Sequence, residues 1–298
     1  MPSDAPAVTE RLGVGVSAVL AAALCTSLSG ILVRLVENAD GWQILFWRSV
    51  FCIATLLTYL LWRHGARIGD RFLSIGRTGL LCSVTLGSSF ITFIFALTNT
   101  TVANVAFTIG MAPVFAALLG WIFLRERVAL RTVGFIALSL GGIALMFSDG
   151  LATGGLSGNV LALVTCLFYS GTIVLLRRGR RVDMIPAVTI AAFWSCLVAA
   201  AIAPGGLAIG LYDMGIIGFM GVVQLGFQYI FFTAGVRHMP AAQAALLGRA
   251  TLVLTPFWAF LGVGETPSLL TLAGGGLVLS AVLGQGLSAW WMGRARAV

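Results

Sequence analysis

Ten apolar stretches of about twenty residues follow one another along the chain, separated by short segments rich in charged residues, Gly, Pro and Asn. About 20 apolar residues are enough for an α-helix to cross a bilayer. The stretches are 12–35, 41–62, 74–98, 101–124, 130–148, 157–177, 185–204, 212–236, 241–263 and 268–291. Only 9% of the 298 residues are charged, against about 25% in soluble domains. The sequence therefore predicts an all-α integral membrane protein with ten transmembrane helices and excludes a water-soluble fold.

The basic residues divide the connections into two kinds. All 18 of them are Arg, and 14 of these gather around the ends of the second, fourth, sixth, eighth and tenth stretches. The connections 98–101, 149–156, 204–211 and 263–267 contain no Arg. Because cytoplasmic connections are enriched in Lys and Arg, this alternation predicts that both termini are cytoplasmic. We expect a multi-pass protein of a bacterial inner membrane whose first helix is retained.

The two halves of the chain resemble each other when one is slid along the other. Phe46-Trp47 then matches Phe193-Trp194, and Ala103-Asn104 matches Ala242-Gln243. Each half holds five predicted helices, and this odd number turns the second half upside down in the membrane. The sequence thus predicts two inverted five-helix repeats, 12–148 and 157–291. Inverted repeats are typical of alternating-access carriers, whose substrate site lies near the midplane.

One segment resembles a known family signature. Met111–Glu126 resembles the fourth helix of EamA-type carriers in the drug/metabolite transporter superfamily, in which a Pro opens the middle of the helix and a Glu closes it. Thr255–Glu265 is a looser second copy, and Ile44–Arg48 resembles the Arg-bearing second helix of that family. The resemblance implies a central cavity lined mainly by the first, third, fourth, sixth, eighth and ninth helices. It also implies export of amino acids or other small metabolites.

Polar side chains within the predicted helices are the candidates for lining that cavity, because polar groups facing lipid are costly. Their helical spacing places several on shared stripes, such as Thr85, Ser88 and Ser89 in the third helix and Gln224 with Gln228 in the eighth. The alternative for each Ser or Thr is that it lets helices pack closely. The candidate substrate-binding residues are Ser27, Thr85, Ser88, Ser89, Asn104, Thr108, Tyr169, Gln224, Gln228, Gln243 and Arg249.

Arg249 and two prolines are singled out in the fourth and ninth helices. Arg249 aligns with Gly110 of the first repeat and so breaks the symmetry; it is expected to attract a substrate carboxylate, or else to bind a helix-end carbonyl. Pro113 and Pro256 are predicted to interrupt the two helices, acting as gating hinges or as static bends. The Gly-rich runs 141–142 and 274–276 are expected to allow close contact between the fifth and tenth helices.

The remaining charges and the missing motifs narrow the function. No Asp or Glu occupies the middle of a predicted helix, which favours zwitterionic, anionic or neutral substrates over cations. Arg48 is expected to be structural, facing Glu37 or Asp40. No pattern of paired carboxylates, Ser with His, or His and Cys predicts an enzyme, a metal site or a cofactor.

These observations favour a secondary carrier that exports small amphipathic metabolites, with aromatic or bulky apolar amino acids as the first candidates. The alternatives are a multidrug or nucleotide-sugar-like exchanger of the same fold, an importer, or an intramembrane lipid-modifying enzyme. The expected partners are a small-molecule substrate and the lipid bilayer, without nucleic acid. The chain is expected to be a monomer or a homodimer, and its energy source stays open.

Overall fold

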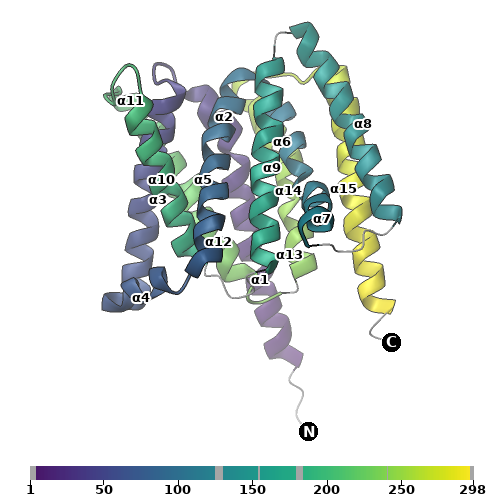
Figure 1. Cartoon of the computed structure of the whole chain (residues 1–298), viewed down its shortest axis with the longest axis horizontal. Coiled ribbons are helices and arrows are strands. Elements are labelled where there is room, and N and C mark those ends of the chain that lie inside the picture. The colour runs from purple at the N-terminus through teal and green to yellow at the C-terminus, as the bar shows by residue number, and fades with distance from the viewer. Residues whose placement is uncertain (1–4, 125–129, 154, 179–183, 240, 296–298) are drawn as a thin grey trace.

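The computed structural model describes residues 5–124, 130–153, 155–178, 184–239 and 241–295, and there the chain is a bundle of helices without strands (Figure 1). Seven helical segments are long and apolar enough to cross a membrane: 13–35, 41–73, 76–99, 102–123, 156–176, 184–202 and 211–235. Three more, Val133–Ser148, Ala250–Val263 and Leu269–Gly284, are apolar but shorter. The all-α membrane fold is confirmed, while the count of ten crossings stays a prediction.

Several of the predicted stretches are divided into shorter helices. The first half contains α1 (Ala5–Ser27), α2 (Ser29–Leu35), α3 (Gly41–His64), η1 (Gly65–Arg67), α4 (Ile68–Leu73), α5 (Gly76–Asn99), α6 (Val102–Gly110), α7 (Ala112–Leu124) and α8 (Leu130–Thr153). The second half contains α9 (Leu156–Arg178), α10 (Met184–Ile202), α11 (Leu211–Phe219), the π-helical η2 (Met220–Phe227), α12 (Gln228–Gly235), α13 (Ala241–Gly248), α14 (Ala250–Val263) and α15 (Leu269–Ala295).

Local sequence signals explain where key helices begin and end. Asp40 opens α3 with a capping box, in which its carboxylate accepts from the Gln43 N–H and the Gln43 side chain accepts from the Asp40 N–H. Thr101 opens α6 by accepting the Asn104 N–H at 3.2 Å. Gly264 closes α14 in the left-handed region, with φ of 67°. The α2–α3 connection therefore ends at a defined residue, and the α14–α15 connection begins at one.

Small and hydroxylated residues bring pairs of helices together. A Cβ on Gly142 of α8 would lie 2.6 Å from the Gly274 carbonyl oxygen of α15, and a Cβ on Gly274 would lie 2.5 Å from the Gly142 oxygen. The predicted close contact of these Gly-rich runs is thus confirmed at one pair. Between α5 and α9, the hydroxyls of Thr85 and Thr172 lie 2.7 Å apart. The central core is apolar and draws on α3, α5, α6, α10 and η2.

The two ends of the bundle differ in charge. The start of α1, the end of α15 and α4 lie at one end, and the starts of α11 and α6 lie at the other (Figure 1). We call the first the Arg-rich end, because η1 and α4 there carry Arg67 and Arg71. Glu126, at the end of the family-like segment, and Arg125, Arg127, Arg180 and Arg181, in the Arg-rich connections, lie outside the described residues. The cytoplasmic orientation of both termini stays a prediction.

Candidate functional site

Two helices are interrupted within the bundle. α6 ends at Gly110 and α7 begins at Ala112, so Met111 forms the break just before Pro113. Pro113 has no N–H to donate to the Ile109 carbonyl one turn earlier, and its ring crowds that carbonyl, which explains the break. The predicted interruption of the fourth helix is therefore found. Whether Pro113 works as a hinge stays a prediction.

The second interruption lies elsewhere than predicted. α14 continues through Pro256, and the break between α13 and α14 falls at Arg249, seven residues earlier. The prediction that Pro256 interrupts the ninth helix is wrong, because neighbouring helices can accommodate a proline inside a transmembrane helix. The sequence thus predicted which helix is interrupted, but not the residue at which the interruption lies.

The two interruptions contact each other. The Arg249 Nη1 donates to the Gly110 carbonyl oxygen at 3.1 Å. That oxygen lies at the C-terminal end of α6, where unpaired carbonyls carry partial negative charge and attract a cation. At the ends of the same helices, the Glu265 carboxylate after α14 reaches the first N–H of α6. The α6–α7 and α13–α14 pairs therefore run antiparallel and meet at their breaks.

Tyr169 of α9 lies beside this meeting point. Its phenol lies close to the Arg249 guanidinium and to the phenol of Tyr229. Tyr169 is 38% exposed, whereas the next residue, Ser170, is fully buried and donates to the Ala112 carbonyl oxygen at the start of α7. α9 thus holds the broken helix through Ser170 and leaves part of the Tyr169 side chain exposed near Arg249.

The other predicted site residues are dispersed in the bundle. Ser27 is buried, and its hydroxyl accepts from the Trp258 indole N–H at 3.1 Å. Thr85 joins α5 to α9, and the Ser89 hydroxyl donates to the Leu86 carbonyl of its own helix. Of the remaining candidates, Thr108 and Gln224 are buried, Ser88 and Gln228 are half-buried, and Gln243 is exposed. The predicted role of these residues in substrate binding stays a prediction.

Asn104 is engaged by the protein itself. Its amide nitrogen donates to Thr100 and Asn159 at 3.3 and 3.1 Å, and its oxygen accepts from the Thr271 hydroxyl at 2.8 Å. Asn104 is 2% exposed, and the network joins α6, α9 and α15. A substrate could reach this amide only if the network opened.

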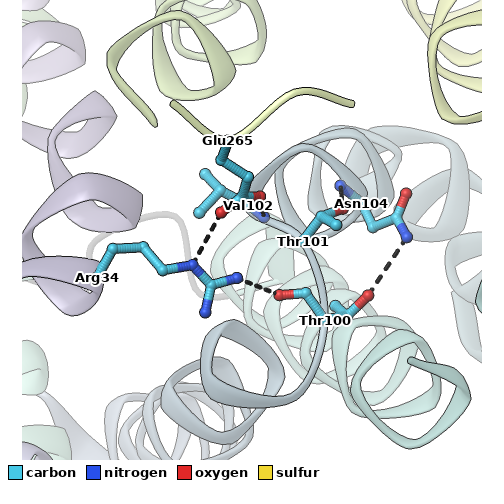
Figure 2. A network of polar contacts seen from close by, with 6 residues as sticks. All are labelled: Arg34, Thr100, Thr101, Val102, Asn104 and Glu265. Carbon is cyan, nitrogen blue, oxygen red and sulfur yellow. Dashed lines mark hydrogen bonds and ion pairs between the residues drawn. The ribbon is translucent and has the colours of Figure 1, made fainter. Parts of the chain in front are cut away.

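An ion pair that the sequence did not predict joins α2 to the α14–α15 connection at the end opposite the Arg-rich end. The Arg34 Nε lies 2.8 Å from Glu265 Oε2, and the Arg34 Nη2 donates to the Thr100 carbonyl oxygen at 2.6 Å (Figure 2). The second carboxylate oxygen of Glu265 accepts from the Val102 N–H at 2.5 Å. We call Arg34, Thr100, Val102 and Glu265 the end clasp. One sequence signal was available, because Arg34 is the only charged residue in its apolar stretch.

Asp213 makes a second closure at the same end. Its carboxylate accepts three backbone N–H groups, from Glu37, Asn38 and Ala39, at 2.9 to 3.0 Å. These residues connect α2 to α3, whereas Asp213 lies in the first turn of α11. The carboxylate therefore holds together two connections that are distant in the sequence.

Arg48 contacts different groups from those predicted. Its side chain is fully buried, its Nη2 lies 3.5 Å from the Phe90 carbonyl oxygen, and its guanidinium lies over the Phe90 ring. The expectation that it faces Glu37 or Asp40 is wrong, because Asp40 caps α3 and Glu37 lies in the α2–α3 connection. Among the described residues, the Arg48 Nε and the Gln224 Oε1 have no hydrogen-bond partner. Gln224 belongs to η2, and π-helical turns occur frequently at functional sites.

Comparisons with known proteins agree on the kind of molecule. Residues 13–148 and 156–285 each match the EamA-like transporter family. The pseudopaline exporter CntI of Pseudomonas aeruginosa (strain UCBPP-PA14) is 28% identical over 287 residues, covering 90% of this chain and 95% of the relative. Solute carrier family 35 member G1 of Homo sapiens is 23% identical, covering 94% of this chain and 80% of the relative. A crystal structure with 16% identity and a TM-score of 0.64, covering 93% of this chain and 98% of its own, shares the fold.

Proposed function

The chain belongs to the EamA-like transporter family, and on this premise we propose that it is a secondary carrier exporting small amphipathic metabolites by alternating access. The observation that carries the proposal is the contact between two interrupted helices through Arg249 and Gly110. Discontinuous helices place charged and polar helix ends inside the membrane, where carriers bind solutes. The Arg249 guanidinium supplies a hydrogen-bond donor to the Gly110 carbonyl at the broken end of α6.

The antiparallel arrangement supports ten crossings in two inverted repeats, 12–148 and 157–291. The start of α6 lies against the end of α14, and the breaks of the two helices meet. Two separate family matches, one in each half, agree with a duplicated unit. In such a carrier, one repeat rocks against the other around a central solute.

The chemistry around Arg249 favours a substrate with a carboxylate. A guanidinium offers two donor edges and pairs well with planar carboxylates. In the proposed complex, the carboxylate would take one edge of Arg249, and the α6 carbonyl end, including Gly110, would face an ammonium group. Tyr169 would contact an aromatic or bulky apolar side chain. Amino acids of this type are therefore our first candidate substrates.

We interpret the structure as a state that is closed at the end opposite the Arg-rich end. The end clasp and Asp213 join connections at the end opposite the Arg-rich end. If the Arg-rich end is cytoplasmic, as the positive-inside rule predicts, the closed end is the exit to the outside of a bacterial inner membrane. Export would then require the end clasp to open.

Transport by purified protein in liposomes tests the proposal. Labelled phenylalanine, leucine, organic acids, quaternary amines and nucleotide sugars would be offered with and without a pH gradient. We expect uptake of the amino acids by the native chain, loss of uptake in Arg249→Ala, and native uptake in the exposed control variant Arg237→Ala.

Three results would contradict parts of the proposal. Native uptake by Arg249→Ala would remove this side chain from the site. Uptake of quaternary amines alone would favour the multidrug alternative, and uptake of nucleotide sugars alone would favour the exchanger. The experiment uses either a monomer or a homodimer equally well, since every proposed group lies within one chain.

A further inference from the structure

A surface hollow of about 410 Å³ lies at the Arg-rich end, away from the carrier site. Its lining consists of Arg63, His64, Arg67, Asp70, Arg71 and Ser74. The walls are the end of α3, η1 and α4, which form a compact link between α3 and α5 (Figure 1). Gly65 and Gly76, with φ of 55° and 57°, occupy the left-handed positions that reverse the chain on either side of this link. The walls of the hollow are therefore ordered helical elements.

The charges in the hollow are not balanced by the protein. Three Arg residues line it together with one acid, Asp70. The Arg63 guanidinium donates to the Tyr59 hydroxyl and lies over that ring. In the described part of the chain, the side chains of Arg67 and Arg71 make no hydrogen bond or ion pair. The hollow thus offers two uncompensated guanidinium groups, which suit a phosphate group through paired N–H donors.

Large apolar side chains stand exposed beside these cations. Trp62, directly before Arg63, is 83% exposed, and Leu73, at the end of α4, is 82% exposed. Trp is enriched where a membrane protein crosses the boundary between hydrocarbon and headgroups. A free phosphate ion would use the Arg side chains alone. A phospholipid would use both, with its headgroup in the hollow and its acyl chains against Trp62 and Leu73.

We propose that this hollow binds the phosphate headgroup of an anionic phospholipid. The net positive lining attracts an anionic headgroup at the membrane surface. The neighbouring apolar side chains favour a membrane lipid over a soluble phosphate compound. This site does not depend on the transported substrate or on the carrier function.

Lipid binding to the purified full-length chain in a neutral detergent tests this proposal. Native mass spectrometry would measure binding of phosphatidylglycerol and of the zwitterionic phosphatidylcholine, with inorganic phosphate as a competitor. The test variant is Arg67→Ala/Arg71→Ala. The matched control is Arg77→Ala/Arg237→Ala, which removes the same charge from exposed positions outside the hollow. A third variant, Arg67→Lys/Arg71→Lys, keeps the charge and shows that folding is intact.

We expect phosphatidylglycerol to bind the native chain at least tenfold more tightly than phosphatidylcholine. The Ala pair should weaken that binding at least tenfold, the control should change it less than twofold, and the Lys pair should restore part of it. Equal weakening in the test and control variants would reduce the effect to general charge attraction and overturn the site. Full displacement by inorganic phosphate at low millimolar concentration, or native binding by the Ala pair, would overturn it as well.

Discussion

Opening of the end clasp should follow from one substitution, Glu265→Gln. The carboxylate pairs with Arg34 and accepts the Val102 N–H, so the amide removes the charge from both interactions while keeping the shape. The pair is partly exposed, with side-chain exposures of 28% and 17%, so its ionic contribution is about 0.5 kcal/mol. The Gln amide still accepts the Val102 N–H, so the change from a charged to a neutral acceptor costs about 1 kcal/mol. The closed state should lose about 1.5 kcal/mol, which changes the ratio of open to closed molecules about 13-fold.

Distance measurement between spin labels reports this change. The labels would be placed at the exposed positions Glu37 and Thr266, on the two connections beside the clasp, after replacement of the native cysteines. Glu265→Gln should add a population with longer distances, whereas the control Asp70→Asn, at the Arg-rich end, should leave the distribution unchanged. Arg34→Lys should give an intermediate shift, because one ammonium group cannot reproduce the fork that joins Glu265 to Thr100. An unchanged distribution in Glu265→Gln would refute the clasp as a determinant of closure.

Three further substitutions test the packing of the bundle. Gly142→Ala should lower the melting temperature in detergent, because the new methyl group would be overpacked against Gly274 at a cost of about 1–3 kcal/mol. The control Gly141→Ala, which has open space around its Cβ position, should leave the melting temperature unchanged. Equal effects of the two variants would contradict the close contact. Asp213→Ala should leave three backbone N–H groups without their acceptor, at a cost of about 2 kcal/mol. Hydrogen exchange of the backbone amides of residues 37–39 should then be faster. Unchanged exchange rates would contradict the role of Asp213 in holding this connection. Asn104→Ala should cost about 1–3 kcal/mol of stability by breaking the buried network, and a native melting temperature would show that the network contributes little.

Hydropathy predicted the helices well because the membrane imposes a simple length and composition on every crossing. The break before Pro113 could also be predicted, since proline acts on its own helix. The break at Arg249 could not, because its carbonyl partner belongs to a helix 139 positions away in the chain. A local pattern contains no information on such a partner.

The contacts of the charged residues were the hardest part to predict. Arg34 and Glu265 are 231 positions apart, and each looked like an ordinary helix-end residue. Arg48 contacts a backbone carbonyl and an aromatic ring, neither of which carries a charge that the sequence could match to it. Gln224 and Gln228 were expected on one stripe because an α-helix brings residues four apart together. In η2 the spacing is π-helical, and one side chain is buried while the other is half-buried.

The π-helical η2 has a mechanical consequence for the helix that contains it. Its hydrogen bonds span five residues instead of four, so the segment holds surplus backbone within an otherwise α-helical rod. If those hydrogen bonds shifted to the α-helical pattern, α12 would turn about its own axis relative to α11. Asp213 would meanwhile keep the start of α11 attached to the α2–α3 connection. A helix with such a segment can rotate one half relative to the other while the Asp213 contacts stay intact.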